Sequence, residues 1–320
     1  MSDGAAQQRV AVRVEQIGPE AAGQRIDNYL ITQLKGVPKS RVYRILRRGE
    51  VRVNRGRVSA DYRLQAGDAV RIPPLRVNVA PTPVTNSPLP ARLARSILYE
   101  DDRLLVLNKP SGVAAHGGSG IALGAIEALR AARPEAPYLE LVHRLDRETS
   151  GCLMVAKRRS LLRELHAQLR AHAIDKRYLL LVQGRWQGGD RRVDLALSRD
   201  LVRGGERVVR VAADGQESAT RFTPLEPFAG ATLLQARPLS GRTHQIRVHA
   251  AASGHPIAGD SKYGDPAFNA ALRERGLRRL FLHASELRLE LPGGAPLRVA
   301  APLDPELERL LDELRRADAV

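Results

Sequence analysis

Six prolines fall within residues 73–95 and divide the chain into a short part and a long part. Proline fixes one backbone dihedral angle and removes a hydrogen-bond donor, so no helix interior or central strand tolerates this density. We therefore expect an extended linker over residues 74–95, without helix or central strand. This linker predicts a small domain over residues 24–73 and a larger domain over residues 96–320. A lead-in over residues 1–23 precedes the small domain and is expected to be flexible until a short strand around residues 10–14.

The chain is strongly basic. It contains 51 Lys and Arg against 35 Asp and Glu, a formal net charge of +16 with a pI near 10.8. Such an excess favours a polyanionic partner, because each neutralised phosphate releases condensed counterions. No apolar stretch approaches the roughly 20 residues that a membrane span needs, and the first residues lack the apolar core of a signal peptide. We therefore expect a cytoplasmic protein that binds nucleic acid and no membrane.

Cysteine and histidine usage limits the chemistry of the chain. Cys152 is the only cysteine, which excludes an intramolecular disulfide and any metal site with two cysteine ligands. His143, His244 and His249 have no carboxylates grouped around them at metal-ligand spacing. We expect most of them to be structural hydrogen-bonding residues, and we expect no metal and no cofactor.

The small domain contains two helical patterns. Apolar residues recur at three- and four-residue steps from Ile26 to Leu34, and a second helix is expected to start with Ser40 as N-cap and to end before Gly49. The second helix has one apolar face and one face of arginines. A solvated charged face is the alternative, but the absence of acidic residues on that face favours phosphate contact. The residues assigned to RNA binding in this domain are Lys39, Arg41, Arg44, Arg47, Arg48 and Arg52.

Residues 25–72 also resemble a known RNA-binding module. The matching segments are residues 25–30, 40–41, 49–54 and 66–70, and they resemble the S4 domain. In S4 domains the second helix and the following turn bind structured RNA. The resemblance therefore implies that the basic helix binds structured RNA.

The larger domain alternates strand and helix patterns. We expect strands over residues 97–99, 104–108, 153–156, 178–182, 232–236 and 245–248, and helices over residues 122–132 and 305–318. This alternation predicts an α+β fold. On the strand expected at 245–248, Arg247 points away from its apolar neighbours Ile246 and Val248, and an arginine facing inward there requires a charged partner.

Residues 142–151 read Val-His-Arg-Leu-Asp-Arg-Glu-Thr-Ser-Gly and lie between two apolar runs. They predict a loop bracketed by strands. Asp146 lies between Arg144 and Arg147, whose guanidinium groups favour the ionised carboxylate. Three interpretations stay open from the residue types alone: a salt bridge that pins a turn, an acceptor for a sugar hydroxyl, and a catalytic group.

This loop resembles the catalytic signature of the RluA-type pseudouridine synthases, His-Arg-Leu-Asp-x-x-Thr-Ser-Gly, at every fixed position. The resemblance continues through residues 108–112, 176–178, 240–249, 254–260 and 282–284. With the S4 domain it covers nearly the whole chain after residue 20, and it is closest to the type C members that act on large-subunit ribosomal RNA. It implies an α+β pseudouridine synthase fold, with a mixed, largely antiparallel sheet and a central cleft, preceded by the small S4 domain.

The resemblance implies isomerisation of uridine to pseudouridine: the N1–C1′ bond breaks, the base rotates, and it rejoins the ribose through C5. It assigns Asp146 as the nucleophile, which attacks either C1′ or C6, and Tyr178 to stacking on the base and assisting removal of the C5 proton. It assigns Arg247 as the partner of Asp146. Arg144 fills the space left by the flipped base or binds a backbone phosphate, and Arg242 binds RNA phosphate.

Two rival classes follow from the same residues. A non-catalytic RNA-binding factor for ribosome assembly would use only the basic surface. A nucleoside hydrolase usually needs two carboxylates around the scissile bond, whereas only Asp146 lies in a motif and Glu148 occupies a variable position. We expect a monomeric synthase whose partner is structured RNA, either 23S ribosomal RNA or pre-50S particles, with transfer RNA as the alternative substrate.

Overall fold

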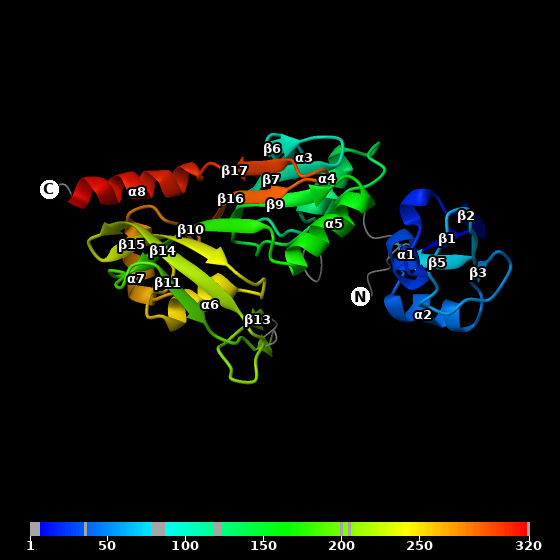
Figure 1. Cartoon of the computed structure of the whole chain (residues 1–320), viewed down its shortest axis with the longest axis horizontal. Helices are drawn as coiled ribbons and strands as arrows, with labels where there is room; N and C mark the ends of the chain where they lie inside the picture. The colour runs from blue at the N-terminus through cyan, green and yellow to red at the C-terminus, as the bar shows by residue number, and fades with distance from the viewer. Residues whose placement is uncertain are drawn as a thin grey trace. The chain divides into compact units, whose positions relative to one another are not determined.

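The chain divides into two compact units with separate hydrophobic cores, Met1–Ser87 and Pro88–Val320. The computed structural model shown in Figure 1 describes residues 7–34, 37–78, 87–117, 123–198, 201–203 and 206–318. No helix among these residues is long and apolar enough to cross a membrane.

The first unit packs two helices and a short 3-10 helix against short strands. Its helices are η1 (Pro19–Ala21), α1 (Ile26–Gln33) and α2 (Lys39–Arg47), and its strands are β1 (Gln7–Val10), β2 (Arg13–Gln16), β3 (Arg52–Val53), β4 (Ala69–Ile72) and β5 (Leu75–Asn78). Strands β2, β4 and β3 form an antiparallel sheet, and β1 pairs with β5. The apolar face of α2, with Val42, Ile45 and Leu46, is buried against Ile26 and Leu30 of α1. The predicted two-helix pattern is therefore confirmed.

The start of α2 differs from the prediction. The helix begins at Lys39 with Pro38 as N-cap, and no side chain caps it, so the N-cap assigned to Ser40 is wrong. Proline at this position has no N–H to satisfy, and its fixed dihedral suits entry into a helix. Gly49 follows the helix with φ of +66°, the left-handed conformation expected there.

The proline-dense segment and the lead-in contain more structure than we expected. Helix α3 (Leu89–Ala94) and strand β5, which pairs with β1 alone, lie inside the segment predicted to be an extended linker. In the lead-in, β1 and β2 overlap the strand expected around residues 10–14, and η1 was not expected. Pro90 is tolerated because it occupies the first turn of α3, where a backbone N–H has no partner within the helix. Residues 1–6 and 79–86 of these two predictions lie outside the described residues.

The second unit is built on one ten-stranded sheet. Its strands are β6 (Ile97–Glu100), β7 (Leu104–Lys109), β8 (Glu140–Leu141), β9 (Ser150–Ala156), β10 (Asp175–Gln183), β11 (Arg191–Asp194), β14 (Ala219–Phe228), β15 (Ala231–Pro238), β16 (Leu282–Glu290) and β17 (Pro296–Ala300). The order is β11-β14-β15-β10-β16-β9-β7-β6, with β17 on β16 and β8 on β9. A separate hairpin is formed by β12 (Leu201–Arg203) and β13 (Glu206–Val208).

The pairing in this sheet is antiparallel except between β9 and β16, which run parallel. The mixed, largely antiparallel sheet predicted from the sequence is therefore confirmed. Helices α4 (Ala125–Ala132), α5 (Arg159–Arg170), α6 (Gln245–Ala252), α7 (Pro266–Glu274) and α8 (Pro305–Asp318) accompany it. Figure 1 shows α8, in red, beside the β14 end of the sheet, where its leucines pack on Leu181 and Phe281.

The strand predicted over residues 245–248 is wrong, because these residues form the first turn of α6. Residues 245–250 alternate polar and apolar side chains as a half-buried strand would, yet all six are buried, the polar ones included. A short run of this kind does not distinguish a buried helix from a strand by periodicity. Arg247 therefore projects from a buried helix and not from a strand.

The parallel junction between β9 and β16 depends on one glycine. Ser150 pairs with His283, and Gly151 pairs with Ala284. Gly151 has φ of +107°, and a Cβ added there would lie 2.2 Å from the carbonyl oxygen of Ala284. Only glycine lets the two backbones approach so closely at this point.

We expect Gly151→Ala to lower the free energy of unfolding by more than the ~1–3 kcal/mol of a strained backbone conformation alone, because the methyl group also collides with backbone. Gly230→Ala is the matched control, since Gly230 has φ of +79° but nothing within 4 Å of an added Cβ. Chemical denaturation of both variants measures the difference. Equal losses of stability would show that the contact with Ala284 is unimportant.

Candidate active site

One cavity of about 380 Å³ collects the site residues that were predicted in the second unit. Its walls come from the loop before β9, the C-terminal end of α5, the start of β10, and the loop that leads into α6. The predicted residues that line it are Arg144, Asp146, Tyr178, Arg242 and Arg247. Strand β10 lies in the middle of the sheet order, so the cavity matches the central cleft that we predicted.

The loop that carries Asp146 is held by a buried lysine that sequence reasoning did not single out. Lys109, at the end of β7, is fully buried. Its ammonium group donates to three backbone carbonyls, those of Pro110, Val113 and Arg147, at 3.1, 2.6 and 3.2 Å. The hydroxyl of Ser111 donates to the next carbonyl of the loop at 2.7 Å. The motif over residues 108–112 therefore fixes the backbone directly after Asp146.

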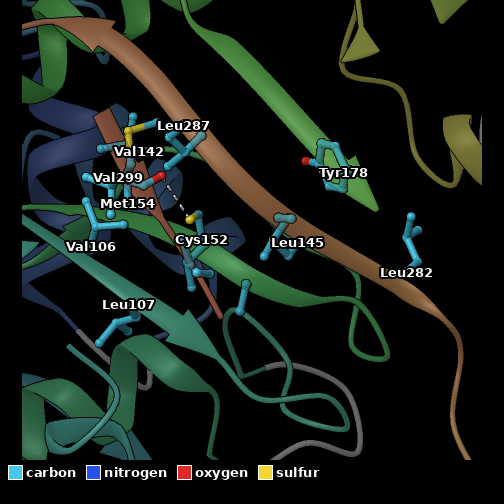
Figure 2. Close-up of a cluster of buried hydrophobic side chains, with 14 of the residues drawn as sticks. Val106, Leu107, Val142, Leu145, Cys152, Met154, Tyr178, Leu282, Leu287 and Val299 are labelled. Carbon is cyan, nitrogen blue, oxygen red and sulfur yellow. Dashed lines mark hydrogen bonds between the residues drawn. The ribbon is translucent and has the colours of Figure 1, made fainter. Parts of the chain in front are cut away.

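Burial lowers the pKa of Lys109 to about 7, and the negative charge of Asp146 opposes the shift. From the other side, the loop is anchored by an apolar side chain. Leu145 is buried, and Figure 2 shows it within the cluster of side chains that also contains Cys152, Leu282 and Tyr178. Asp146 is thus held between a buried apolar residue and a backbone fixed by a cation.

Asp146 lies close to an imidazole and a phenol. The Nε2 atom of His244 is 4.0 Å from the carboxylate of Asp146, and the Nδ1 atom lies 2.8 Å from the hydroxyl of Tyr263. Burial lowers the pKa of His244 despite the opposing charge of Asp146. Burial and then the charge of Asp146 raise the pKa of Tyr178, so its hydroxyl stays protonated at neutral pH.

His244, one of the three histidines of which most are expected to be structural, lies in the cavity wall. It precedes α6 with φ of +52°, a left-handed conformation that is uncommon for residues other than glycine. His143 also lines the cavity, whereas His249 does not, and both make structural hydrogen bonds. His143 accepts a hydrogen bond from the backbone N–H of Met154, and His249 lies 3.0 Å from the hydroxyl of Ser218.

The partner predicted for Arg247 is wrong. Its guanidinium group makes two hydrogen bonds of 2.7 Å to Asp260, and both side chains are buried. Burial alone would lower the pKa of Arg247, but these hydrogen bonds and the charges of Asp260 and Asp146 raise it. Asp260 lies in the segment 254–260 that resembles the synthases. The sequence therefore marked this residue but did not indicate that it pairs with Arg247. Arg247 acts on Asp146 through its charge, without a direct ion pair.

The loop before α6 is held by a buried amide. The side chain of Gln245 donates to the carbonyl of Ala219 and accepts from the backbone N–H of Arg242, at 2.9 and 3.0 Å. Arg242 itself is exposed and donates to the carbonyl of Glu217 at 3.2 Å. Arg144, on the opposite loop, is also exposed. These two arginines therefore present charge at the rim of the cavity.

The remaining predicted residues lie in the first unit. Lys39, Arg44, Arg47 and Arg48 are exposed along α2, whereas Arg41 and Arg52 are half-buried. Arg48 lies 3.9 Å from Glu50, which follows the helix. In the part of the chain that the structure describes, no group of three or more His, Cys, Asp or Glu side chains is arranged to hold a metal ion.

A basic helical unit joined to a mixed sheet, whose central cavity holds one carboxylate among arginines, has the components of an RNA pseudouridine synthase. The family model for RNA pseudouridylate synthase matches residues 103–252, and the S4 domain model matches residues 24–70. The chain belongs to the RNA pseudouridylate synthase family and carries an N-terminal S4 domain.

Several proteins are similar to this chain over nearly its whole length. The ribosomal large subunit pseudouridine synthase C of Salmonella typhimurium is 55% identical over 312 residues, which cover 96% of this chain and 98% of the relative. The protein of the same name from Pasteurella multocida is 54% identical, over 95% and 94% of the two chains. The structure of human RNA Pseudouridylate Synthase Domain Containing 4 covers 71% of this chain and 95% of its own, with 27% identity and a TM-score of 0.61.

The lowered pKa of Lys109 predicts a pH dependence of stability. In the unfolded chain this lysine titrates near 10.5, and in the folded protein near 7. Between these values the unfolded chain binds a proton that the folded protein has released, so stability rises with pH. We expect the difference in unfolding free energy between wild type and Lys109→Met to shift in favour of wild type from about pH 7 to about pH 10. Chemical denaturation across this range measures it, and a constant difference would contradict the shift.

Proposed function

We propose that this protein isomerises specific uridines of bacterial 23S ribosomal RNA to pseudouridine, on free RNA or on pre-50S particles. The observation that carries the proposal is the single carboxylate, Asp146, among the side chains that line a basic cavity. The name of the relatives that are 54–55% identical supports the large ribosomal subunit as the substrate.

The cavity suits a nucleotide that has left its stack. A volume of about 380 Å³ lies within the range of small-ligand sites. Taking a uridine out of its helix costs a few kcal/mol, which contacts to the flipped base and to phosphates must offset. Arg144 and Arg242 at the rim supply such contacts, and Arg144 is placed to fill the vacated space in the RNA or to bind a phosphate.

Asp146 is proposed as the nucleophile. Its carboxylate lines the cavity and is half-buried. The positive charge of Arg247 interacts with it electrostatically. A carboxylate held in this way can form a covalent bond to C1′ of the ribose or to C6 of the base. In the overall reaction the N1–C1′ bond is replaced by a C5–C1′ bond, C5 loses a proton and N1 gains one. The reaction needs no oxidant and consumes no water.

Tyr178 is proposed to contact the uracil ring. Its side chain lies in the cavity wall and belongs to the apolar cluster of Figure 2, so the ring offers a stacking surface. Because its pKa is raised, the hydroxyl acts as a neutral hydrogen-bonding group and not as a phenolate base. Any part that it takes in removal of the C5 proton is therefore that of a phenol.

The protein is proposed to act as a monomer. We place the reaction in the cytoplasm, where bacterial large-subunit RNA is found.

We expect Asp146→Asn to abolish pseudouridine formation while RNA affinity stays within about tenfold, roughly 1.4 kcal/mol. Pseudouridine mapping after incubation of unmodified 23S RNA or bulk transfer RNA with each protein measures the effect. Glu148→Gln is the matched control, because this neighbouring carboxylate does not line the cavity, and it should keep its activity.

Product that depends on Asp146 in ribosomal RNA would establish both the activity and its sites. Product only in transfer RNA would keep the chemistry and overturn the substrate. Binding without product in either RNA would favour a non-catalytic assembly factor.

The exposed arginines of α2 predict a salt dependence. We expect Arg44→Gln, Arg47→Gln and Arg48→Gln together to weaken RNA binding, because these side chains are exposed on one helix. They should also flatten the plot of log affinity against log salt concentration. Each lost phosphate contact lowers that slope by about 0.9 in a duplex. Filter binding at several salt concentrations gives the slope, and an unchanged slope would mean that α2 does not contact phosphates.

A further inference from the structure

Lys176, near the start of β10, is a cation of the cavity that the proposed chemistry does not use. Its side chain is half-buried and lines the cavity with Tyr178, two positions further along the same strand. Among the described residues no carboxylate pairs with it and no group accepts a hydrogen bond from it. Burial lowers its pKa, and no neighbouring charge compensates for the shift.

The other cations of the cavity are either paired or solvated. Arg237 binds Asp175 at 2.7 Å, and Arg247 binds Asp260 at 2.7 Å. Arg144 is exposed to water. None of the described residues supplies the negative charge that Lys176 lacks, whereas an RNA substrate carries such charges on its phosphates.

The described residues around Lys176 supply no negative charge to it. Its neighbour His143 is half-buried, and desolvation together with the charge of Lys176 lowers the pKa of that imidazole to about 3. The Nε2 atom of His143 already accepts a hydrogen bond from the backbone of Met154 at 3.1 Å. His143 is therefore neutral and occupied. A partly desolvated ammonium group without an anion is unfavourable. An anion bound beside Lys176 would therefore be stabilised.

We propose that Lys176 binds a phosphate group next to the flipped uridine, and so fixes the nucleotide backbone while Tyr178 contacts the base. Two strand positions separate these side chains by roughly 6–7 Å along β10. The substrate brings a phosphate on either side of the target nucleotide. The uracil carbonyls, the other acceptors within the cavity, carry no formal charge and would leave the ammonium uncompensated. This inference rests on the proposed uridine isomerisation.

A double-substitution cycle tests the contact. The substrate is an RNA fragment around a mapped target uridine, with all phosphates natural or with one uncharged methylphosphonate on the 5′ or the 3′ side. We expect Lys176→Met to reduce kcat/KM on the natural RNA by roughly 10- to 100-fold. One of the two methylphosphonates should reduce wild-type kcat/KM by a similar factor. On that RNA, Lys176→Met should cause no further loss.

Lys39→Met is the matched control, because Lys39 lies on the exposed face of α2 in the other unit. Its effect should be the same on natural and substituted RNA. Lys176→Met should also melt at or above the wild-type temperature, since it removes a buried charge without a partner. A lower melting temperature with losses that simply multiply would show that Lys176 is structural and would overturn the proposal.

The outcomes distinguish a failure of the proposed uridine isomerisation from a failure of the Lys176–phosphate contact. Wild-type protein that is inactive on the natural RNA would overturn the proposed function and, with it, the role of Lys176. Wild-type activity with full activity of Lys176→Met, or with independent effects of the two changes, would overturn the phosphate contact alone.

Discussion

The close approach of β9 and β16 at Gly151 and Ala284 is the constraint on which the site depends. Strands β9 and β16 are the parallel pair in an otherwise antiparallel sheet. Their pairing joins β9, β7 and β6 to the strands on the side of β10. The loop with Asp146 enters β9 directly before this step, while β10 pairs with the other edge of β16. The junction therefore brings the carboxylate and Tyr178, which are distant in sequence, to one cavity.

Around this junction the site is held by charges that do not themselves face the substrate. Lys109 fixes the backbone of the Asp146 loop, and Asp260 holds Arg247 in place on α6. Both groups are buried, and both compensate their desolvation with several hydrogen bonds, as buried ions must. Lys176 has no such hydrogen bonds among the described residues, and the proposed substrate phosphate would supply them.

The sequence predicts the local elements well and the long-range pairings poorly. The helix over residues 305–318 and the loop around Asp146 follow from periodicity and flanking apolar runs. The assignment of residues 245–248 failed because their polar and apolar residues alternate as in a strand, while the structure buries both kinds in a helix. The partner of Arg247 failed with it, since side-chain pairing depends on how α6 packs. Nothing local distinguishes Lys109 from a surface lysine, because its acceptors are backbone carbonyls, one of them 38 residues away.

The single cysteine has a practical consequence. Cys152 is fully buried in the middle of β9, its thiol points toward the carbonyl of Val299, and burial raises its pKa to about 12 (Figure 2). Because the thiolate is the reactive form, this thiol is inert toward alkylating probes in the folded state. A cysteine introduced on the surface would therefore be the one thiol of the protein that reacts with such probes. Fluorophores or crosslinkers could be attached to either unit without first removing the native residue.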